Sequence, residues 1–322
     1  MKRVAILTSG GDAPGMNACL RACVRYAIHN DIEMYGVERG YVGLLNNRIE
    51  RLNTRSVSDI IHRGGTILKT ARCPEFKEKE YILQAADTLK AYAIDSLIVI
   101  GGDGSFRGAK DLSDIGGINV VAIPGTIDND LAYTDYTLGF DTAVNTVMSA
   151  MNNLRDTMAS HDRASMLEVM GRKAGDIALY SAVAGGAEYC IIPEVPYDIE
   201  EIARSMKQSI KRGKTSNMIV LAEGAGDREE ICSKIKEIAG ISVKTTTLGH
   251  IQRGGSPSMF DRVLAAKMAV RAVDLILDNK TNRAIGIKDN HIIDLDITEA
   301  LSLKHDIDKE LYEVAHILSL HK

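Results

Sequence analysis

The 322-residue sequence has no tryptophan and only four phenylalanines, so it offers few of the flat aromatic surfaces on which nucleic-acid bases stack. It also lacks a surplus of positive charge, because its formal net charge is −4. A chain of this kind has no general attraction to nucleic acid or to anionic lipid. Any phosphate binding must therefore depend on a few local groups.

Cysteine is scarce, and no apolar run reaches the roughly 20 residues of a membrane span. Cys19 and Cys23 have no matching pair or histidine cluster, which argues against a metal site. The odd total of five cysteines favours reduced thiols. The first residues, MKRVAILT, place a short apolar run after a basic pair, which is typical of a first strand rather than of a signal peptide. We expect a cytoplasmic protein.

One unit recurs along the chain: a short apolar run, a polar loop with glycine, and a helical pattern. The apolar runs lie at 3–8, 96–100, 119–123, 165–170, 218–223 and 244–249. Ser256 and Pro257 suit the N-cap and the first position of a late helix. This alternation predicts an α/β fold of mainly parallel sheet with flanking helices.

Two glycine-rich loops follow the runs at 3–8 and 96–100. In IGGDGS, from Ile100 to Ser105, glycines let backbone N–H groups approach an anion at a helix N-terminus. Asp103 would repel phosphate unless a cation lies between them, which favours a nucleotide with Mg²⁺. The alternative is a tight turn with Asp103 as an N-cap. TSGGDAPG, from Thr8 to Gly15, repeats the pattern, and neither loop has a P-loop or dinucleotide fingerprint.

A third loop follows the run at 119–123. In AIPGTIDND the strand is expected to break at Pro124 and Gly125 and to open into a loop that carries Asp128 and Asp130. The carboxyl edge of an open α/β sheet is where such folds bind ligands, although a plain polar turn is the alternative. Further cationic side chains flank strands or glycines, and together they fit a site for two phosphorylated ligands: Arg72, Arg163, Arg172, Arg253 and His250.

Several motifs in register carry a specific resemblance. They include TSGGDAPGMNA, VSDIIHRGGT, ARCPEF, VIGGDGS, PGTIDND, TLGFDTA, EVMGR and GHIQRGGSP. The chain resembles the bacterial ATP-dependent 6-phosphofructokinases from residue 4 to about 270. The resemblance implies two α/β lobes with the active site between them. One lobe would hold 1–138 and 251–303, for the nucleotide, and the other 139–250 and 304–322, for the sugar phosphate.

The resemblance also implies a reaction, the phosphorylation of the 1-hydroxyl of fructose 6-phosphate by ATP. Asp128 would be the general base, Thr126 would lie against the transferring group, and Asp103 and Asp130 would serve the Mg²⁺. Gly11, Arg72 and Arg172 would surround the phosphates. The nucleotide contacts would add Cys73, Gly102, Gly104 and Ser105.

The sugar phosphate would bind a second set of residues. Met170 and Glu223 match sugar contacts, and the 6-phosphate would be held by Arg163, Lys244, His250 and Arg253. Arg163 and Lys244 would reach in from a neighbouring subunit, which implies a homotetramer. Glycine at 104 and 125 would leave room for a nucleotide, where pyrophosphate-using relatives carry aspartate and lysine.

A regulatory pocket for ADP or phosphoenolpyruvate is implied on the same basis. Its residues would be Arg21, Arg25, Arg55, Arg155, Gly186, Glu188 and Lys214. Arg21 and Arg25, one helical turn apart, could equally form a solvated helix face. The chain departs from the family at Thr54 and Arg55, at Thr215, and at Lys244, where the family carries arginine.

Other functions remain as alternatives. GGDG also occurs in lipid and NAD kinases, but these would not be expected to carry PGTIDND together with GHIQRGG. The chain could also be a catalytically weak sugar-phosphate-binding paralogue, or a kinase of a related phosphorylated sugar, given Lys244. The presence of Asp103, Thr126, Asp128 and Arg172 argues against loss of catalysis.

Overall fold

The computed structural model describes residues 2–161, 164–214 and 216–319, and the chain divides into two compact units. Unit 1 comprises Met1–Ile127, Leu131–Thr142 and Arg253–Lys304; unit 2 comprises Asp128–Asp130, Ala143–Gln252 and His305–Lys322. The segment Asp128–Asp130 therefore belongs with unit 2, although the residues on both sides of it belong to unit 1. Within the described ranges, every helix falls short of the length and apolarity that a membrane span requires.

The sheet of unit 1 contains eight described strands. They are β1 (Arg3–Thr8), β2 (Glu33–Val37), β3 (Ile49–Leu52), β4 (Ser96–Gly101), β5 (Asn119–Thr126), β6 (Leu138–Gly139), β11 (Arg283–Lys288) and β12 (His291–Asp296). Their order is β12-β11-β5-β4-β1-β2-β3, with β6 paired to β5. Only β2–β3 and β11–β12 pair in antiparallel fashion among these strands.

The centre of this sheet is β1, β4 and β5, which run parallel. The six residues of β4, SLIVIG, are all buried, as a central strand covered on both faces requires. In the register, Thr8 pairs with Ile100, and Gly101 pairs with Pro124. The carboxyl ends of the three strands therefore meet at one edge of the sheet, where the two glycine-rich loops begin.

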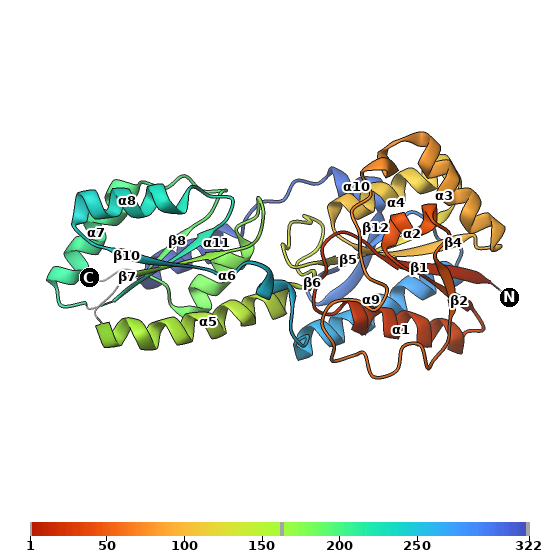
Figure 1. The fold of residues 1–322 in the computed structure, drawn as a ribbon, viewed down its shortest axis with the longest axis horizontal. Helices are drawn as coiled ribbons and strands as arrows, with labels where there is room; N and C mark the ends of the chain where they lie inside the picture. Colours follow the sequence, from red (N-terminus) through yellow and green to blue (C-terminus); the bar gives the residue numbers. More distant parts are fainter. Residues whose placement is uncertain (1, 162–163, 215, 320–322) are drawn as a thin grey trace. The chain divides into compact units, whose positions relative to one another are not determined.

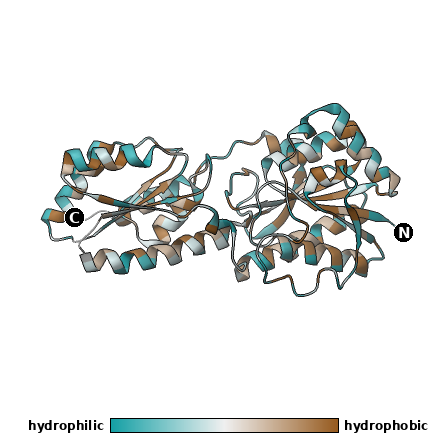
Figure 2. Ribbon diagram, in the orientation of Figure 1, coloured by the Kyte–Doolittle hydropathy of each residue, from teal (hydrophilic) through white to brown (hydrophobic). Residues whose placement is uncertain are grey.

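Helices cover both faces of this sheet (Figure 1). One face carries α1 (Met16–His29) and α9 (Met259–Leu277), which pack against each other. The other carries α2 (Gly40–Leu45), η1 (Pro74–Lys77), α3 (Lys79–Ala91), α4 (Asp103–Gly116) and α10 (Ile297–Ser302). Figure 2 shows mainly hydrophobic strands between helices that are partly hydrophilic, as expected for a sheet buried between two helical layers.

Unit 2 has a smaller sheet of four described strands, all parallel, in the order β10-β7-β9-β8. The strands are β7 (Ala164–Val169), β8 (Tyr189–Ile191), β9 (Asn217–Ala222) and β10 (Val243–Thr247). Buried Met206 and Ile235 belong to α7 (Ile199–Lys211) and α8 (Arg228–Ala239) and share one core with the sheet. The other elements are α5 (Phe140–His161), α6 (Asp176–Gly185), α11 (Lys309–Ser319), which packs on α6, and η2 (Gly249–Arg253).

The predicted α/β fold of mainly parallel sheet is confirmed, but two local predictions were wrong. The strand does not break at Pro124 and Gly125, because β5 continues to Thr126. Pro124 there pairs with Gly101 and Gly125 pairs with Leu138, which keeps the backbone extended. The N-cap of α9 is Ser258 rather than Ser256, and its side chain accepts a hydrogen bond from the Asp261 N–H.

Asp261, in the first turn of α9, is a fully buried carboxylate in unit 1. It accepts hydrogen bonds from the backbone N–H groups of Gly139 and Thr142, both at 2.9 Å, and from the Thr142 hydroxyl. Burial, only partly offset by these bonds, raises the pKa of Asp261 to about 6. The folded chain thus binds this proton more tightly than the unfolded chain does.

This shift predicts a pH-dependent term in stability. A raised carboxyl pKa stabilises the fold when the group is protonated, and that contribution disappears as the pH rises through about 6. Between pH 7 and pH 5 the free energy of unfolding should rise by about 1 kcal/mol in the wild type relative to Asp261→Asn. Urea unfolding at a series of pH values measures this difference. Asp278→Asn, at the exposed end of the same helix, is the control. If the difference in the free energy of unfolding between wild type and Asp261→Asn does not change with pH, the raised pKa of Asp261 is contradicted.

Candidate active site

Several predicted phosphate-binding residues of unit 1 lie at the carboxyl edge of β1, β4 and β5. Ser105, buried in the first turn of α4, joins two of the loops, since its Oγ would lie 3.3 Å from a Cβ on Gly10 and 2.5 Å from a Cβ on Gly101. The backbone carbonyl of Ser105 accepts a hydrogen bond from the Tyr41 hydroxyl at 2.6 Å. Ser105 therefore packs against both glycine-rich loops, which lie side by side at this edge.

Arg253 belongs to the same edge of unit 1. A Cβ on Gly11 would lie 2.0 Å from Arg253 Nη1, so the guanidinium lies directly against the Gly11 backbone, and any larger residue there would displace it. Arg253 Nη1 also donates to the Asp12 carbonyl at 3.3 Å. Thr126 adjoins the second loop, because its Cβ would be 3.5 Å from a Cβ on Gly102. This edge thus combines a cation, a hydroxyl and a helix N-terminus, which are groups suited to phosphate.

The two glycines expected to leave room for a nucleotide differ in their surroundings. No atom lies within 4 Å of a Cβ built on Gly104, so the space there is open. A Cβ on Gly125 would instead lie 2.8 Å from Ile100 Cγ2 and 3.1 Å from Met16 Cε. Gly125 is therefore required by the packing of the core, and only Gly104 borders open space.

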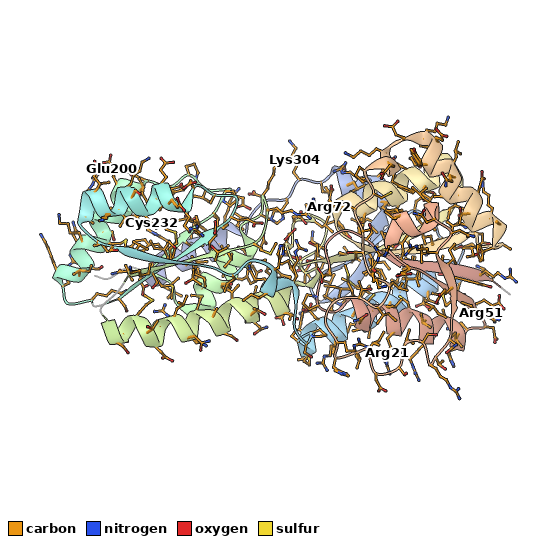
Figure 3. All side chains as sticks on the ribbon, viewed as in Figure 1. Arg21, Arg51, Arg72, Glu200, Cys232 and Lys304 are labelled. Carbon is orange, nitrogen blue, oxygen red and sulfur yellow. The ribbon has the colours of Figure 1, made fainter. Side chains whose placement is uncertain are left out.

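Asp103 is the first residue of α4 and not its N-cap, which is Gly102. Both of its carboxylate oxygens accept from Arg107, one turn along the helix, at 2.8 and 3.0 Å. The two side chains are about half exposed, and exposed pairs of this kind contribute less than about 1 kcal/mol. A Mg²⁺ ion could compete for Asp103 at small cost. Arg72, labelled in Figure 3, and Cys73 lie just before η1; Arg72 is exposed and Cys73 is partly buried.

Unit 2 holds the second group of site residues, centred on Asp128. The Asp128 side chain is 1% exposed, and its Oδ2 lies 3.2 Å from Arg172 Nε. Asn129 and Arg172 both have φ near +55°, and Gly171 between Met170 and Arg172 has φ +141°. Asparagine tolerates the left-handed conformation, whereas arginine adopts it only at a cost. The fold thus accepts local backbone strain where it places this ion pair.

The carboxyl ends of β7 and β9 position the side chains around this pair. The two strands are parallel neighbours, with Val169 opposite Ala222. The Arg172 N–H donates to Glu223 Oε1 at 2.8 Å. The Met170 N–H donates to Oε1 of Gln252 at 3.3 Å, and this buried glutamine also donates to the Gly249 carbonyl at 3.1 Å. Gln252 thus links η2, which carries exposed His250, to Met170. Gln252 was not among the site residues predicted from the sequence.

The predicted phosphate contact Lys244 is not part of this cluster. Lys244 lies on β10 and pairs with Ser165, near the start of β7. Met170 lies five residues further along, about 16 Å away at the rise of a strand. Within one chain, Lys244 is therefore remote from Met170 and Glu223. Arg163 lies outside the described residues.

The residues expected in a regulatory pocket fall into two sets. In unit 2, Glu188 Oε1 lies 2.9 Å from Lys214 Nζ and 3.9 Å from Arg155 Nη1. Arg155 also donates to the carbonyls of Gly185 and Gly186. Those four predicted residues, Arg155, Gly186, Glu188 and Lys214, form one cluster. In unit 1, Arg21 and Arg25 lie on α1, and Arg55 is exposed in the turn after β3.

Three further titratable groups in unit 2 form a cluster that was not predicted from the sequence. Asp176, Glu194 and His305 offer ligand atoms that lie within 4.8 Å of one another. The His305 Nε2 and Asp176 Oδ2 atoms are 2.7 Å apart and share a hydrogen bond. This bond, with neighbouring carboxylates, raises the pKa of His305 despite its partial burial.

A separate cavity of about 520 Å³ opens in unit 2 between α7, β8 and α11. It is lined by polar and aromatic side chains that include Tyr189, Arg212, Tyr312 and His316. Of the site residues predicted from the sequence, only Glu188 lines this cavity. The proposed catalytic and substrate-binding residues are not among those that line it.

Comparisons with known proteins identify the family. The phosphofructokinase family model matches residues 3–276. The chain is 56% identical over 319 residues to an ATP-dependent 6-phosphofructokinase of Clostridium acetobutylicum, covering 99% of this chain and 100% of that protein. It is 57% identical over 320 residues to one from Alkaliphilus metalliredigens, with the same coverage. A solved structure of phosphofructokinase from Saccharomyces cerevisiae has a TM-score of 0.87 and 33% identity, covering 99% of this chain and 48% of that chain. The chain belongs to the phosphofructokinase family.

Proposed function

We propose that this protein transfers the γ-phosphoryl group of ATP to the 1-hydroxyl of fructose 6-phosphate, forming fructose 1,6-bisphosphate and ADP in glycolysis. The observation that carries the proposal is the buried Asp128 carboxylate beside Arg172, at 3.2 Å, on the segment that follows β5. A general base must reach the attacking hydroxyl, and a cation nearby can stabilise negative charge on the transferring group. The names of the relatives support both the donor and the acceptor.

The proposed step uses Asp128 as the base. Asp128 takes the proton of the 1-hydroxyl as that oxygen attacks the γ-phosphorus, and the bond between phosphorus and the β,γ-bridging oxygen breaks to release ADP. Thr126 and the backbone at Gly11 lie along the phosphates, and Arg172 stabilises the charge on the moving group. Positioning and electrostatics of this kind supply most of the catalysis in phosphoryl transfer.

The donor is proposed to be ATP with Mg²⁺. The open space at Gly104 and the N-terminus of α4 suit a nucleotide whose phosphates lie near Gly102 and Ser105. Arg72 and Cys73 would add contacts from the loop before η1. Asp103 and Asp130 would hold the Mg²⁺, which neutralises phosphate charge when it is bound.

The acceptor is proposed to bind through Met170 and Glu223, which contact the sugar, and through cations around its 6-phosphate. Those cations are Arg163, Lys244, His250 and Arg253. The distance of Lys244 from Met170 along the sheet fits a residue that serves the site of a neighbouring subunit, as in the homotetramer that we propose. ADP or phosphoenolpyruvate would act at Arg155, Gly186, Glu188 and Lys214, together with Arg21, Arg25 and Arg55. A cytoplasmic location fits this role.

The proposal predicts a specific pattern of donor and acceptor use. ADP release should occur with MgATP and fructose 6-phosphate, since Gly104 leaves room for a nucleotide. Pyrophosphate should not replace ATP, as expected from the names of the ATP-dependent relatives. A coupled assay of ADP, run with fructose 6-phosphate and with other sugar phosphates, measures this; phosphate release reports the pyrophosphate reaction. Turnover that needs pyrophosphate, or that is faster with another phosphorylated sugar, would contradict the proposed reaction.

A second prediction concerns Lys244. Arginine presents a planar fork that can make two parallel bonds to phosphate, whereas lysine offers one compact, strongly hydrated charge. Hydrogen bonds to charged groups contribute about 1.5–3 kcal/mol, of which lysine keeps part. We therefore expect Lys244→Arg to lower the KM for fructose 6-phosphate several-fold and to leave the KM for ATP and the kcat nearly unchanged.

Steady-state kinetics with each substrate varied in turn provide this measurement. Lys207→Arg, an exposed substitution on α7, is the matched control and should leave both KM values as they are. An unchanged or higher KM for fructose 6-phosphate in Lys244→Arg would show that lysine is adapted to its surroundings, or that the substrate is a different phosphorylated sugar.

A further inference from the structure

The cluster of Asp176, Glu194 and His305 assembles three separate parts of unit 2. Asp176 is the first residue of α6, Glu194 follows β8, and His305 is the first residue of unit 2 after Lys304, the residue labelled in Figure 3. Asp176 is 5% exposed, and the other two side chains are partly buried. Charged groups are tolerated inside folded proteins when they are paired. The three side chains of this cluster therefore depend on their contacts with one another and with nearby backbone groups.

Asp176 connects the cluster to the segment that carries the proposed base. Its Oδ2 is hydrogen-bonded to His305 Nε2 at 2.7 Å, and its Oδ1 accepts a longer bond, 3.4 Å, from Asn129 Nδ2. Asn129 is buried and holds a left-handed backbone conformation between Asp128 and Asp130. The Asp176 carboxylate therefore contacts the residue next to Asp128.

Glu194 connects the cluster to the loop that carries Arg172. Its Oε1 accepts a hydrogen bond from the Gly175 N–H at 2.7 Å, at the end of the loop that begins with Gly171. Its Oε2 is buried and would lie 2.7 Å from a Cβ on Gly175, so this carboxylate packs directly on the loop backbone. The cluster thus contacts both segments whose side chains form the ion pair of Asp128 and Arg172.

His305 supplies the positive partner in this cluster. The carboxylates that raise its pKa come from three elements: Asp176 on α6, Glu194 after β8, and Asp130 after β5. Asp306, its neighbour in the chain, is paired with Lys309 at 2.6 Å. Without a cation at position 305, Asp176 and Glu194 would repel each other, and the bonds that they make to Asn129 and Gly175 would loosen.

We infer that His305 is a positioning residue for catalysis: acting through Asp176 and Glu194, it holds the side chain of Asn129 and the backbone of Gly175 so that Arg172 stays beside Asp128. The inference rests on the proposed function of that pair. A displacement of about 1 Å in a reacting group can lower a rate by about 100-fold, so restraint of this kind affects kcat. Binding of the substrates uses other residues and should change little.

The test compares His305→Gln with wild type in kcat and in both KM values between pH 6 and pH 9. Glutamine keeps a hydrogen-bond donor and removes the charge, so we expect kcat to fall about ten-fold and each KM to stay within about two-fold. Wild-type kcat should fall toward the variant's value as the pH rises through the raised pKa of His305, and His305→Gln should lack this decline. Asp176→Asn should show the same loss of kcat as His305→Gln.

Two variants complete the design. His316→Gln, an exposed histidine on α11, is the matched control and should behave as wild type. His305→Lys keeps a cation and should restore kcat to within about three-fold of wild type. If His305→Gln does not fold, the wild-type pH profile and His305→Lys still decide the matter.

Three results would overturn the inference. They are a His305→Gln kcat within two-fold of wild type across the pH range, a wild-type kcat with no decline up to pH 9, and one equivalent of a bound transition metal that His305→Gln loses. Failure of the proposed function would be seen separately, as absence of ADP release by the wild type with ATP and fructose 6-phosphate. Normal wild-type turnover with an insensitive His305→Gln refutes the inference on His305 alone.

Discussion

Burial of the Asp128 carboxylate is the constraint on which the proposed site depends. A carboxylate that is 1% exposed loses most of its hydration, and the penalty for an unpaired buried ion is several kcal/mol. Arg172 Nε, 3.2 Å away, offsets that penalty while leaving its own side chain 56% exposed. The pair therefore places the carboxylate proposed as the base away from water, beside a cation that a ligand can reach, and this combination suits the proposed phosphoryl transfer.

The residues around Asp128 and Arg172 hold these two side chains in place. Glu223 fixes the backbone N–H of Arg172, and the left-handed conformations at Gly171, Arg172 and Asn129 turn the chain so that the two side chains meet. Glycine adopts such a conformation freely, whereas at Arg172 it costs about 1–3 kcal/mol, so the neighbouring contacts must hold that residue in place. The cluster around His305 is one such contact, since it reaches both segments through Asn129 and Gly175.

Much of this arrangement follows from the sequence, because parallel strands bring their carboxyl ends to one edge. The runs at 3–8, 96–100 and 119–123 predicted the strands β1, β4 and β5 of a mainly parallel α/β fold, and the loops after them contain Gly11, Asp103 and Asp128. That the three strands are neighbours is seen only in the sheet order. The pairing of Asp103 with Arg107 could have been read from their spacing of one helical turn.

Other features depend on contacts that no local pattern encodes. Gly125 looked like room for a nucleotide, but its surroundings are Ile100 and Met16, which depend on how α1 packs on the sheet. His305 lies 129 positions from Asp176, and Gln252 lies 82 from Met170. Neither separation corresponds to a helical or strand repeat, so neither contact can be predicted from the sequence pattern. The strand through Pro124 and Gly125 persists because Gly101 and Leu138 pair with it.

The most direct test of the central claim is a double-mutant cycle on kcat with Asp128→Asn, Arg172→Gln and both together. If the two side chains act as one unit, Asp128→Asn should lower kcat by about 10²–10⁴, and adding Arg172→Gln should lower it little further. MgATP binding and the folded state should persist in all three variants. Losses that multiply in the double variant, or an Asp128→Asn kcat within a few-fold of wild type, would contradict the account.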